Sequence, residues 1–317
     1  MKHAAISGTG SYLPERQLTN TELETKLDTT HDWIFSRTGI SSRHVAAPHE
    51  TTSYMAGLAA KNALEASGLD ADDIDLILVA TCTPEHFFPS MACHVQQALN
   101  ISRPIPAFDV SAACSGFVYA LDIAKQYIAT AAAKHVLVVG SESMSRAIDW
   151  TDRSTCVLFG DGAGAVVLSE SETPGILGSV LHSTYDKDKL LTYPNETIDE
   201  KRALIGMKGN EVFKIAVNMM GDIVDEVLTA SNLHKSDIHW LLPHQANIRI
   251  IQGIAKKLSL PMSQVIVTIE HQGNTSAASI PLALDVAVRD ARIKRGELLL
   301  LESFGGGMTW GAMVVRY

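Results

Sequence analysis

An internal repeat is the feature that most constrains what this chain can fold into. The segment LEASGLDADDIDL at 64–76 resembles LTASNLHKSDIHW at 228–240, at an offset of 164 residues (228 − 64 = 164). A second pair follows in the same order: FGDGAGAVVLS at 159–169 and FGGGMTWGAMVVRY at 304–317, each a glycine-rich turn before an apolar strand. Two such pairs in one order indicate two halves of a duplicated unit.

Strands and helices alternate along both halves. Short, unbroken runs rich in Val, Ile and Leu predict buried strands, with both faces of the sheet covered, at 74–80, 135–140, 164–168 and 297–301. Helical spacing of apolar residues predicts helices between them, at 54–67 and 117–131. This alternation is typical of an α/β fold.

We expect the two halves to comprise residues 1–171 and 172–317. A length of 317 residues is enough for about two domains, and the polar segment 169–175 lies at the junction. The segment 183–206 is polar and irregular, so it is predicted to be a loop carried by the second half.

Charge and apolar patterning exclude several classes of protein. A formal net charge of −9 argues against non-specific binding of nucleic acid. No apolar run approaches the ~20 residues needed to cross a bilayer, and the N-terminal MKHAAISGTGSYLPE lacks the apolar stretch of a secretory signal. We therefore expect a cytoplasmic protein that binds neither nucleic acid nor a membrane.

Motifs for metals and nucleotides are incomplete in this sequence. The four cysteines form no CxxC pair, which disfavours a structural zinc site, and they are too few for a disulfide scaffold. Gly8-Thr-Gly10 has Leu13 where a dinucleotide fingerprint needs glycine, and GDGAG at 160–164 lacks the Lys-Ser/Thr of a phosphate loop. We expect tight turns there, and neither a nicotinamide nor ATP as cofactor.

Cys114 has the sequence context of a nucleophile. It lies in IPAFDVSAACSGFVYAL at 105–121, where a strand-like stretch ends at Val110, small residues follow, and an apolar helix begins near Phe117. Small residues permit a sharp turn and a close approach of substrate, and a helix N-terminus favours a thiolate. The alternative is a small buried cysteine where a helix packs on a strand, the interpretation we adopt for Cys82, Cys93 and Cys156.

Three further residues could complete a site around such a nucleophile. His244 follows an apolar run in WLLPHQAN, and Asn274 lies among small residues in GNTSAASIP, each just before a predicted helix. Gly306, in FGGG, can bring a backbone N–H close to a substrate because no side chain intrudes. Taken singly, His244 could be a core or capping histidine, and Asn274 a turn residue before a helix cap. All three residues lie at turns of a duplicated unit, as Cys114 does, and this shared position favours the interpretation that they belong to one site.

These segments carry a resemblance that runs over essentially the whole chain. The chain is similar to the β-ketoacyl-acyl carrier protein synthase III enzymes, initiating condensing enzymes of bacterial fatty acid synthesis, in the motifs GTGSYLPE, DWIFSRTGI, FDVSAACSG, FGDGAGAVVL, GNEVFK, PHQAN, GNTSAASIP and FGGGMTWG. That family belongs to the thiolase-like superfamily. The resemblance implies a thiolase-like fold, with the duplicated halves forming a five-layered α-β-α-β-α arrangement.

The resemblance also implies a reaction. Cys114, His244 and Asn274 match a Cys-His-Asn triad, and the backbone N–H groups of Cys114 and Gly306 match the oxyanion hole. In the family, the cysteine takes the acyl group of a short acyl-CoA primer, malonyl-acyl carrier protein loses CO₂, and the resulting carbanion attacks the acyl-cysteine. No metal or organic cofactor is implied. His271 does not match the second histidine of the elongating synthases, and Cys156 is too early for the second cysteine of biosynthetic thiolases.

Substrate contacts are implied in the same way. Trp33 and Arg37 match positions that sandwich the adenine of CoA, with Arg153 on its other side, and the pantetheine tunnel is matched by Gly209, Phe213, Ala246 and Asn247. Phe88 matches the residue that reaches into the partner subunit's acyl pocket, which implies a homodimer and fits a short primer such as acetyl. From the residues alone, Trp33 and Phe213 could be packing residues and Arg37 a solvated charge.

The family binds its carrier protein near a basic helix face. Neither Asp nor Glu occurs in 238–263, whereas Arg249, Lys256 and Lys257 lie in that stretch with helical spacing. So few charges ordinarily mark a solvated face. Carrier proteins are acidic, however, and the resemblance implies that they dock here, with Lys214 nearby.

Two other functions are compatible with these motifs. A condensing-enzyme paralogue of a secondary pathway, with a longer or unusual acyl primer, would share the triad and the fold. A non-condensing acyl-binding or regulatory protein could retain the fold, although the intact triad and glycine turn argue against it. A papain-like Cys-His-Asn hydrolase is disfavoured by the duplicated α/β layout.

Overall fold

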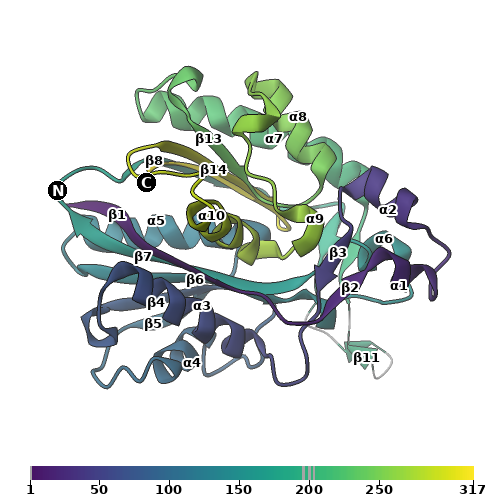
Figure 1. Cartoon of the computed structure of the whole chain (residues 1–317), viewed down its shortest axis with the longest axis horizontal. Helices are drawn as coiled ribbons and strands as arrows, with labels where there is room; N and C mark the ends of the chain where they lie inside the picture. The colour runs from purple at the N-terminus through teal and green to yellow at the C-terminus, as the bar shows by residue number, and fades with distance from the viewer. Residues whose placement is uncertain (1, 195–196, 199–200, 203) are drawn as a thin grey trace.

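Two large β-sheets and three layers of helices form the main body of the protein (Figure 1). The computed structural model describes residues 2–194, 197–198, 201–202 and 204–317. Within them, the strands of the first sheet follow the order β1 (His3–Tyr12), β7 (Asp161–Ser171), β6 (His135–Ser143), β4 (Leu76–Ala80) and β5 (Ala107–Val110). Those of the second follow the order β13 (Trp240–Pro243), β14 (Leu298–Gly305), β15 (Thr309–Arg316) and β8 (Ile176–Ser183).

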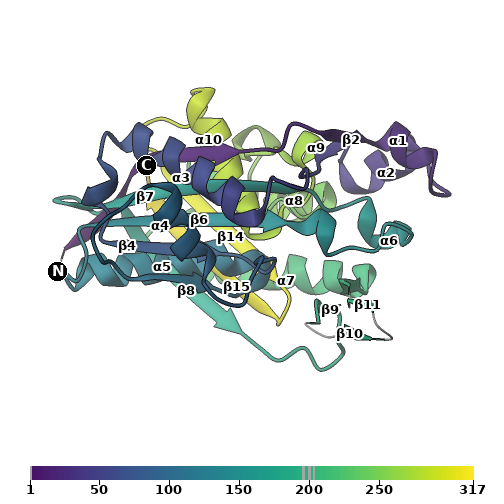
Figure 2. The ribbon, with the colours of Figure 1, turned by 90° about the horizontal axis from the view of Figure 1, so that it is seen from below.

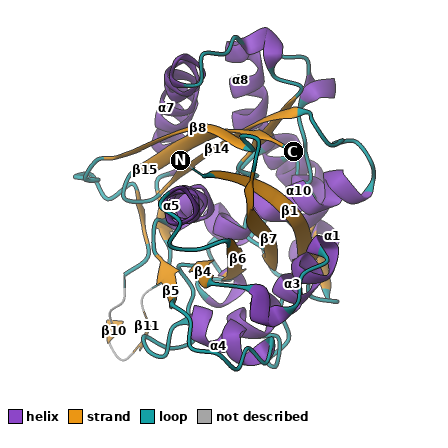
Figure 3. Ribbon diagram, turned by 90° about the vertical axis from the view of Figure 1, so that its left-hand side faces the viewer, coloured by secondary structure: helices purple, strands orange, loops and turns teal. Residues whose placement is uncertain are grey.

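Helices cover both outer faces and fill the space between the sheets (Figure 3). The outer face of the first sheet packs against α3 (Thr52–Ser67) and α4 (Met91–Ala98). Between the sheets lie α5 (Gly116–Ala129) and α10 (Ser279–Arg289), and the outer face of the second sheet packs against α7 (Gly209–Ala230) and α8 (Ile248–Leu258). The predicted α/β fold with a five-layered α-β-α-β-α arrangement is thereby confirmed.

Burial on both faces explains the unbroken apolar strands. In β4, Leu76 and Leu78 belong to the core between the sheets, whereas Ile77 and Val79 pack with α3 and α4. All four side chains are fully buried. Successive side chains of a strand point to opposite faces, so a strand covered on both sides needs apolar residues throughout.

The two halves repeat one local structure. β13 begins 164 residues after β4 (240 − 76 = 164), at the offset of the sequence repeat. A 3₁₀ turn precedes each strand, and its aspartate accepts a hydrogen bond from the start of the turn: Asp73 from the Asp70 N–H at 2.9 Å, and Asp237 from the His234 N–H at 2.8 Å. In both sheets the equivalent strand pairs have the same direction, since β4–β6 and β13–β14 are parallel and β6–β7 and β14–β15 antiparallel. The repeated sequence segments therefore form the same local structure in both halves.

The predicted elements are present with shifted ends. α3 begins at Thr52 because the Thr51 hydroxyl caps it, accepting from the Tyr54 N–H at 3.2 Å. Shorter elements complete the fold: β2 (Gln17–Thr19), α1 (Asn20–Glu24), α2 (His31–Thr38), β3 (Ser42–His44), α6 (Arg153–Cys156) and α9 (Ile269–Gln272).

The segment 183–206 is less irregular than predicted. β9 (Leu191–Thr192) pairs with β12 (Gly206–Met207), and β10 (Thr197–Ile198) pairs with β11 (Lys201–Arg202). Figure 2 shows β9, β10 and β11 at the same end of the molecule as α1, α2 and α6. Positions 195–196, 199–200 and 203 lie outside the described residues.

Strands of the first sheet lie within residues 3–171, and those of the second within residues 176–316. The predicted boundary between residues 171 and 172 falls in the β7–β8 connection, and we retain it as a proposal. No described helix has the length and apolar character needed to cross a membrane.

The close approach of α10 to the first sheet gives a testable prediction. A Cβ on Gly164 of β7 would lie 2.5 Å from the Leu282 nitrogen of α10. The backbones of β7 and α10 cannot move apart without disturbing the core packing. Gly164→Ala should therefore lower the free energy of unfolding by about 1–3 kcal/mol, measured by urea denaturation. Gly206→Ala is the matched control, since its Cβ would meet Thr192 Oγ1 at 3.5 Å. Equal stability of the two variants would contradict this packing.

Candidate active site

A cavity of about 1640 Å³ is lined by residues of both halves. Cys114 lies between β5 and α5, and His244 directly follows β13. Asn274 lies between α9 and α10, and Gly306 in the turn that joins β14 to β15. The fold brings these four residues, up to 192 positions apart in sequence (306 − 114 = 192), to the wall of one cavity.

The backbone around Cys114 is held in a tight elbow. The preceding residue, Ala113, has φ of +47°, a conformation that non-glycine residues rarely adopt. The Ser303 hydroxyl donates to the Cys114 carbonyl at 2.7 Å. Gly305 packs so closely that a Cβ there would lie 2.7 Å from the Cys114 nitrogen. The glycine turn of the second half therefore supports the elbow of the first.

Burial controls the charge of Cys114. Desolvation raises the pKa of the thiol to about 11, although a hydrogen bond with Ser276 opposes the rise. A helix N-terminus contributes about 0.3–1 kcal/mol at exposed sites, and one pKa unit corresponds to about 1.4 kcal/mol. The helix position alone predicted a thiolate, but it is too weak to offset burial, so the resting group at pH 7 is a thiol.

His244 is buried and neutral, and its Nδ1 atom contacts a serine hydroxyl. Burial lowers the pKa of its imidazole to about 3. Nδ1 lies 2.6 Å from Ser279 Oγ, which also accepts the Gln245 N–H at 3.3 Å. When the Ser279 hydroxyl donates its proton to Nδ1, the imidazole proton lies on Nε2. In that tautomer a neutral His244 can donate a hydrogen bond from Nε2, and its low pKa makes it a weak base.

Asn274 is tied to the first half by its own backbone. Its N–H donates to the Leu158 carbonyl at 2.8 Å, and its carbonyl accepts from the Gly160 N–H at 3.0 Å. The side-chain oxygen accepts from the Ser276 N–H at 2.9 Å. The amide NH₂ group is then the part of the side chain that can donate into the cavity.

One wall of the cavity carries a stack of aromatic and cationic groups. The guanidinium carbons of Arg37 and Arg153 lie 4.5 and 4.6 Å from the centre of the Trp33 ring. Both distances are within the range of a cation–π contact. Arg153 also donates to the Asp28 carbonyl. Two cations on one indole make this a site for a planar, anionic group.

The other predicted residues divide into two sets. The cavity is also lined by Phe88, Gly209, Phe213, Ala246, Asn247 and Arg249. Three predicted docking residues do not line it and are exposed on α7 and α8: Lys214, Lys256 and Lys257. Lys257 is engaged within the chain, because its Nζ lies 2.6 Å from Asp222 and donates to the Asn218 carbonyl at 3.2 Å. The sequence placed Lys257 on the predicted docking face and did not reveal this pair.

A buried carboxylate that the sequence reasoning missed supports the cavity floor. Glu142, at the end of β6, accepts from the Thr83 hydroxyl at 2.6 Å and from the Cys82 thiol at 3.2 Å. Burial raises its pKa, and these hydrogen bonds oppose the rise. Cys82 Sγ in turn lies 3.8 Å from the Ser276 hydroxyl that contacts Cys114. An acid within an apolar strand was the only signal for Glu142 in the sequence.

Two family models match the chain. The description "3-Oxoacyl-[acyl-carrier-protein (ACP)] synthase III" matches residues 108–184, and its C-terminal counterpart matches residues 228–317. A β-ketoacyl-[acyl-carrier-protein] synthase III from Alkalilimnicola ehrlichii is 55% identical over 323 residues, covering 100% of both chains. The chain belongs to the synthase III family.

Solved structures of synthase III enzymes have the same fold. That of the Aquifex aeolicus enzyme matches with a TM-score of 0.94 and 48% identity, covering 99% of this chain and 100% of that chain. A priming β-ketosynthase from the R1128 polyketide pathway matches with a TM-score of 0.94 and 37% identity, covering 99% and 96%. The structures similar to this chain therefore include a priming β-ketosynthase from a polyketide pathway.

The raised pKa of Cys114 predicts a pH-dependent reactivity. The rate of Cys114 alkylation by iodoacetamide should rise about tenfold per unit between pH 7 and pH 9, because only the thiolate reacts. Quenched samples analysed by peptide mass spectrometry measure this, with the exposed Cys93 in the same digest as internal reference. A rate that reaches its plateau by pH 7 would show instead that the resting group is a thiolate.

Proposed function

We propose that the protein is the initiating condensing enzyme of type II fatty acid synthesis. It transfers the acyl group of an acyl-CoA primer to Cys114 and joins it to malonyl-acyl carrier protein, giving 3-oxoacyl-acyl carrier protein, CoA and CO₂. The observation that carries the proposal is that Cys114, His244 and Asn274 line one cavity in a chain of the synthase III family. No metal or organic cofactor takes part in these steps.

In the first half-reaction, Cys114 Sγ attacks the thioester carbonyl of acyl-CoA. The C–S bond to CoA breaks, an acyl-cysteine forms, and the thiol proton ends on the CoA sulfur. The N–H groups of Cys114 and Gly306 hold the oxyanion of the tetrahedral intermediate. Since Cys114 rests as a thiol, it loses this proton as the substrate's sulfur leaves.

In the second half-reaction, malonyl-acyl carrier protein loses CO₂, and the electron pair of the broken C–C bond passes to the thioester as an enolate. His244 Nε2 and the Asn274 NH₂ donate hydrogen bonds to the enolate oxygen. The enolate carbon then attacks the acyl-cysteine, and Cys114 leaves as a thiolate that is protonated again. A neutral imidazole suits this role, because it donates without first needing a proton.

The CoA substrate is held along the cavity. Its adenine lies between Trp33 and Arg153, replacing the direct contact of their side chains, with Arg37 on the same indole. The pantetheine arm runs past Gly209, Phe213, Ala246 and Asn247. The two arginines also suit the phosphates of CoA.

We also propose a homodimer. Phe87 and Phe88 are adjacent aromatic residues that are 76% and 86% exposed in the single chain. An exposed aromatic pair of this kind is typical of a protein interface. In the dimer, Phe88 reaches into the partner's acyl pocket. All four cysteines are free thiols, which supports the reducing cytoplasm as the location.

The acidic carrier protein docks on the outer face of α7 and α8. Lys214 and Lys256 are exposed there, and Arg249 lies at the cavity wall, where its guanidinium donates to the Ser36 carbonyl at 3.1 Å. Lys257 contributes less charge than its position implied, because Asp222 neutralises it.

The division of labour between the two half-reactions can be tested directly. His244→Ala and Asn274→Ala should still gain the acyl mass at Cys114 when mixed with acyl-CoA. Their decarboxylation of malonyl-acyl carrier protein should fall about 100-fold or more, because each removes a donor to the developing enolate. Intact mass spectrometry and release of labelled CO₂ measure the two steps.

Cys114→Ser is the control for the adduct and should gain no acyl mass. Normal decarboxylation in both His244→Ala and Asn274→Ala would contradict the assigned roles. A comparison of acetyl-, octanoyl- and branched acyl-CoA as substrates of the wild type identifies the preferred primer. Preference for octanoyl-CoA would favour a secondary-pathway paralogue, the alternative that the R1128 relative makes relevant.

Docking gives a separate prediction. Lys214→Glu and Lys256→Glu should raise KM for malonyl-acyl carrier protein by about three- to tenfold, and more at low salt, since both reverse an exposed charge. Acyl-CoA priming should be unchanged. Lys61→Glu, on α3 in the opposite outer layer, is the matched control. Equal loss of priming and condensation would count against docking at this face.

A further inference from the structure

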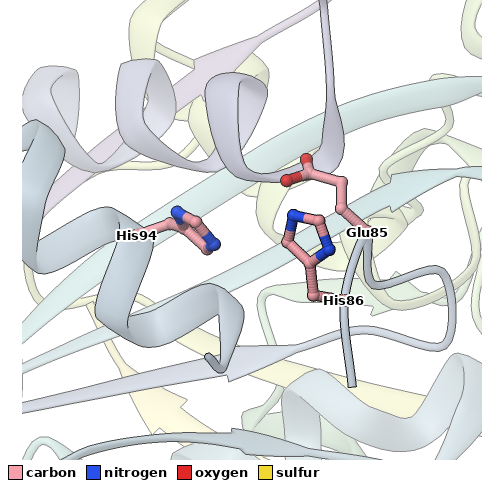
Figure 4. Close-up of side chains that lie close together, drawn as sticks. All are labelled: Glu85, His86 and His94. Carbon is pink, nitrogen blue, oxygen red and sulfur yellow. The ribbon is translucent and has the colours of Figure 1, made fainter. Parts of the chain in front are cut away.

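Two histidines and a glutamate converge beside the exposed aromatic pair. Glu85 and His86 lie in the segment between β4 and α4, and His94 lies on α4. One ligand atom from each residue lies within 4.8 Å of the other two. Figure 4 shows the three side chains, with the His86 ring between His94 and Glu85 in this view. The two imidazole centres are 5.9 Å apart.

His94 supplies an observation that points to a ligand. Its Nε2 atom is buried and has no hydrogen-bond partner among the described residues. Buried polar atoms are rarely left unpaired, so such an atom calls for a partner outside the protein chain. The rings of His86 and His94 are tilted by 36° and share no hydrogen bond that would satisfy this nitrogen.

Glu85 provides a fixed negative charge at the same place. Burial alone would raise the pKa of its carboxyl, but hydrogen bonds from Ser53 and Thr51 and the nearby His94 lower it below the ordinary value. Its oxygens accept from the Ser53 N–H at 2.7 Å and from the Ser53 hydroxyl at 2.8 Å. The carboxylate is therefore held in place at the start of α3, and each oxygen keeps a lone pair for another partner.

Capping of α3 explains the position of Glu85, but it does not explain two imidazoles beside it. Two imidazoles and one carboxylate form a donor set that suits Zn²⁺, with three protein ligands and an open position for water. In a zinc site the ligand atoms lie about 2.0–2.2 Å from the ion, and so closer to one another than the 4.8 Å within which these three atoms lie. Small side-chain rotations would bring the three atoms to coordination distance.

We propose that Glu85, His86 and His94 form a binding site for a divalent transition-metal ion of the Zn²⁺ class. The ion satisfies the buried His94 nitrogen and links the segment after β4 to α4. That segment continues into Phe87 and Phe88, so the ion restrains the exposed aromatic pair. This site departs from the sequence-based expectation of no metal, which rested on the spacing of the cysteines and on the family resemblance. It does not depend on the proposed reaction.

Zinc binding to the metal-stripped full-length protein, measured by isothermal titration calorimetry, tests the proposal. The Cys114→Ser variant removes the cavity thiol as a competing ligand. We expect one ion per chain with a Kd of micromolar or below, and a thermal unfolding midpoint that rises with Zn²⁺. His86→Gln and His94→Gln should each weaken binding by about 100-fold or more. His234→Gln, an exposed histidine on the second half, should bind as the parent does.

Co²⁺ provides a readout of the coordination itself. Visible absorption of the Co²⁺-loaded protein should show the intense bands of a four-coordinate site and lose them in His86→Gln. Because His86 is exposed, this variant tests the site even if His94→Gln fails to fold. Unchanged zinc affinity in His86→Gln, or an unchanged cobalt spectrum, would overturn the proposal. The proposal would also be overturned if zinc binding were lost only when Cys114 is replaced.

Discussion

Contact between the two halves is the constraint on which the site depends. α5 and α10 share the space between the sheets, and the backbones approach so closely there that glycine is required at Gly164 and Gly305. Gly305 presses the β14–β15 turn against the elbow of Cys114, while Asn274 is hydrogen-bonded to the Leu158–Gly160 backbone. Cys114 of the first half and Asn274 of the second are therefore held in fixed relative positions by direct backbone contacts between the halves.

The same burial that builds the site sets its chemistry. It raises the pKa of Cys114 to about 11 and lowers that of His244 to about 3, so both groups are neutral at pH 7. A neutral pair is suited to thioester exchange and to hydrogen bonding of an enolate, and poorly suited to hydrolysis by a strong base. Ser279 completes the arrangement with a hydroxyl 2.6 Å from Nδ1 of His244. The cavity thus favours carbon–carbon bond formation through donor placement rather than through charged residues.

Much of the fold and site followed from local sequence patterns. Strands with both faces covered and the duplicated turns at Asp73 and Asp237 depend on neighbours in sequence, so composition and spacing reveal them. The small residues around Cys114 indicated the elbow, although Ser303 and Gly305 of the second half also hold it. Burial opposes the thiolate that the helix position of Cys114 favours, and burial cannot be seen in sequence, whereas a helix position can. The ion pair of Lys257 could not be predicted, because its partner, Asp222, lies on another helix.

The sequence by itself determined the α/β fold and the family, and it predicted the residues of the site, because these depend on periodicity and on short motifs. Only the tertiary structure decided that Ser279 orients His244, that Glu142 and Ser276 support the cavity floor, and that His94 lies beside Glu85. Each of these contacts joins separate elements through side chains. Their distances depend on how the layers pack, which no local pattern of residues specifies.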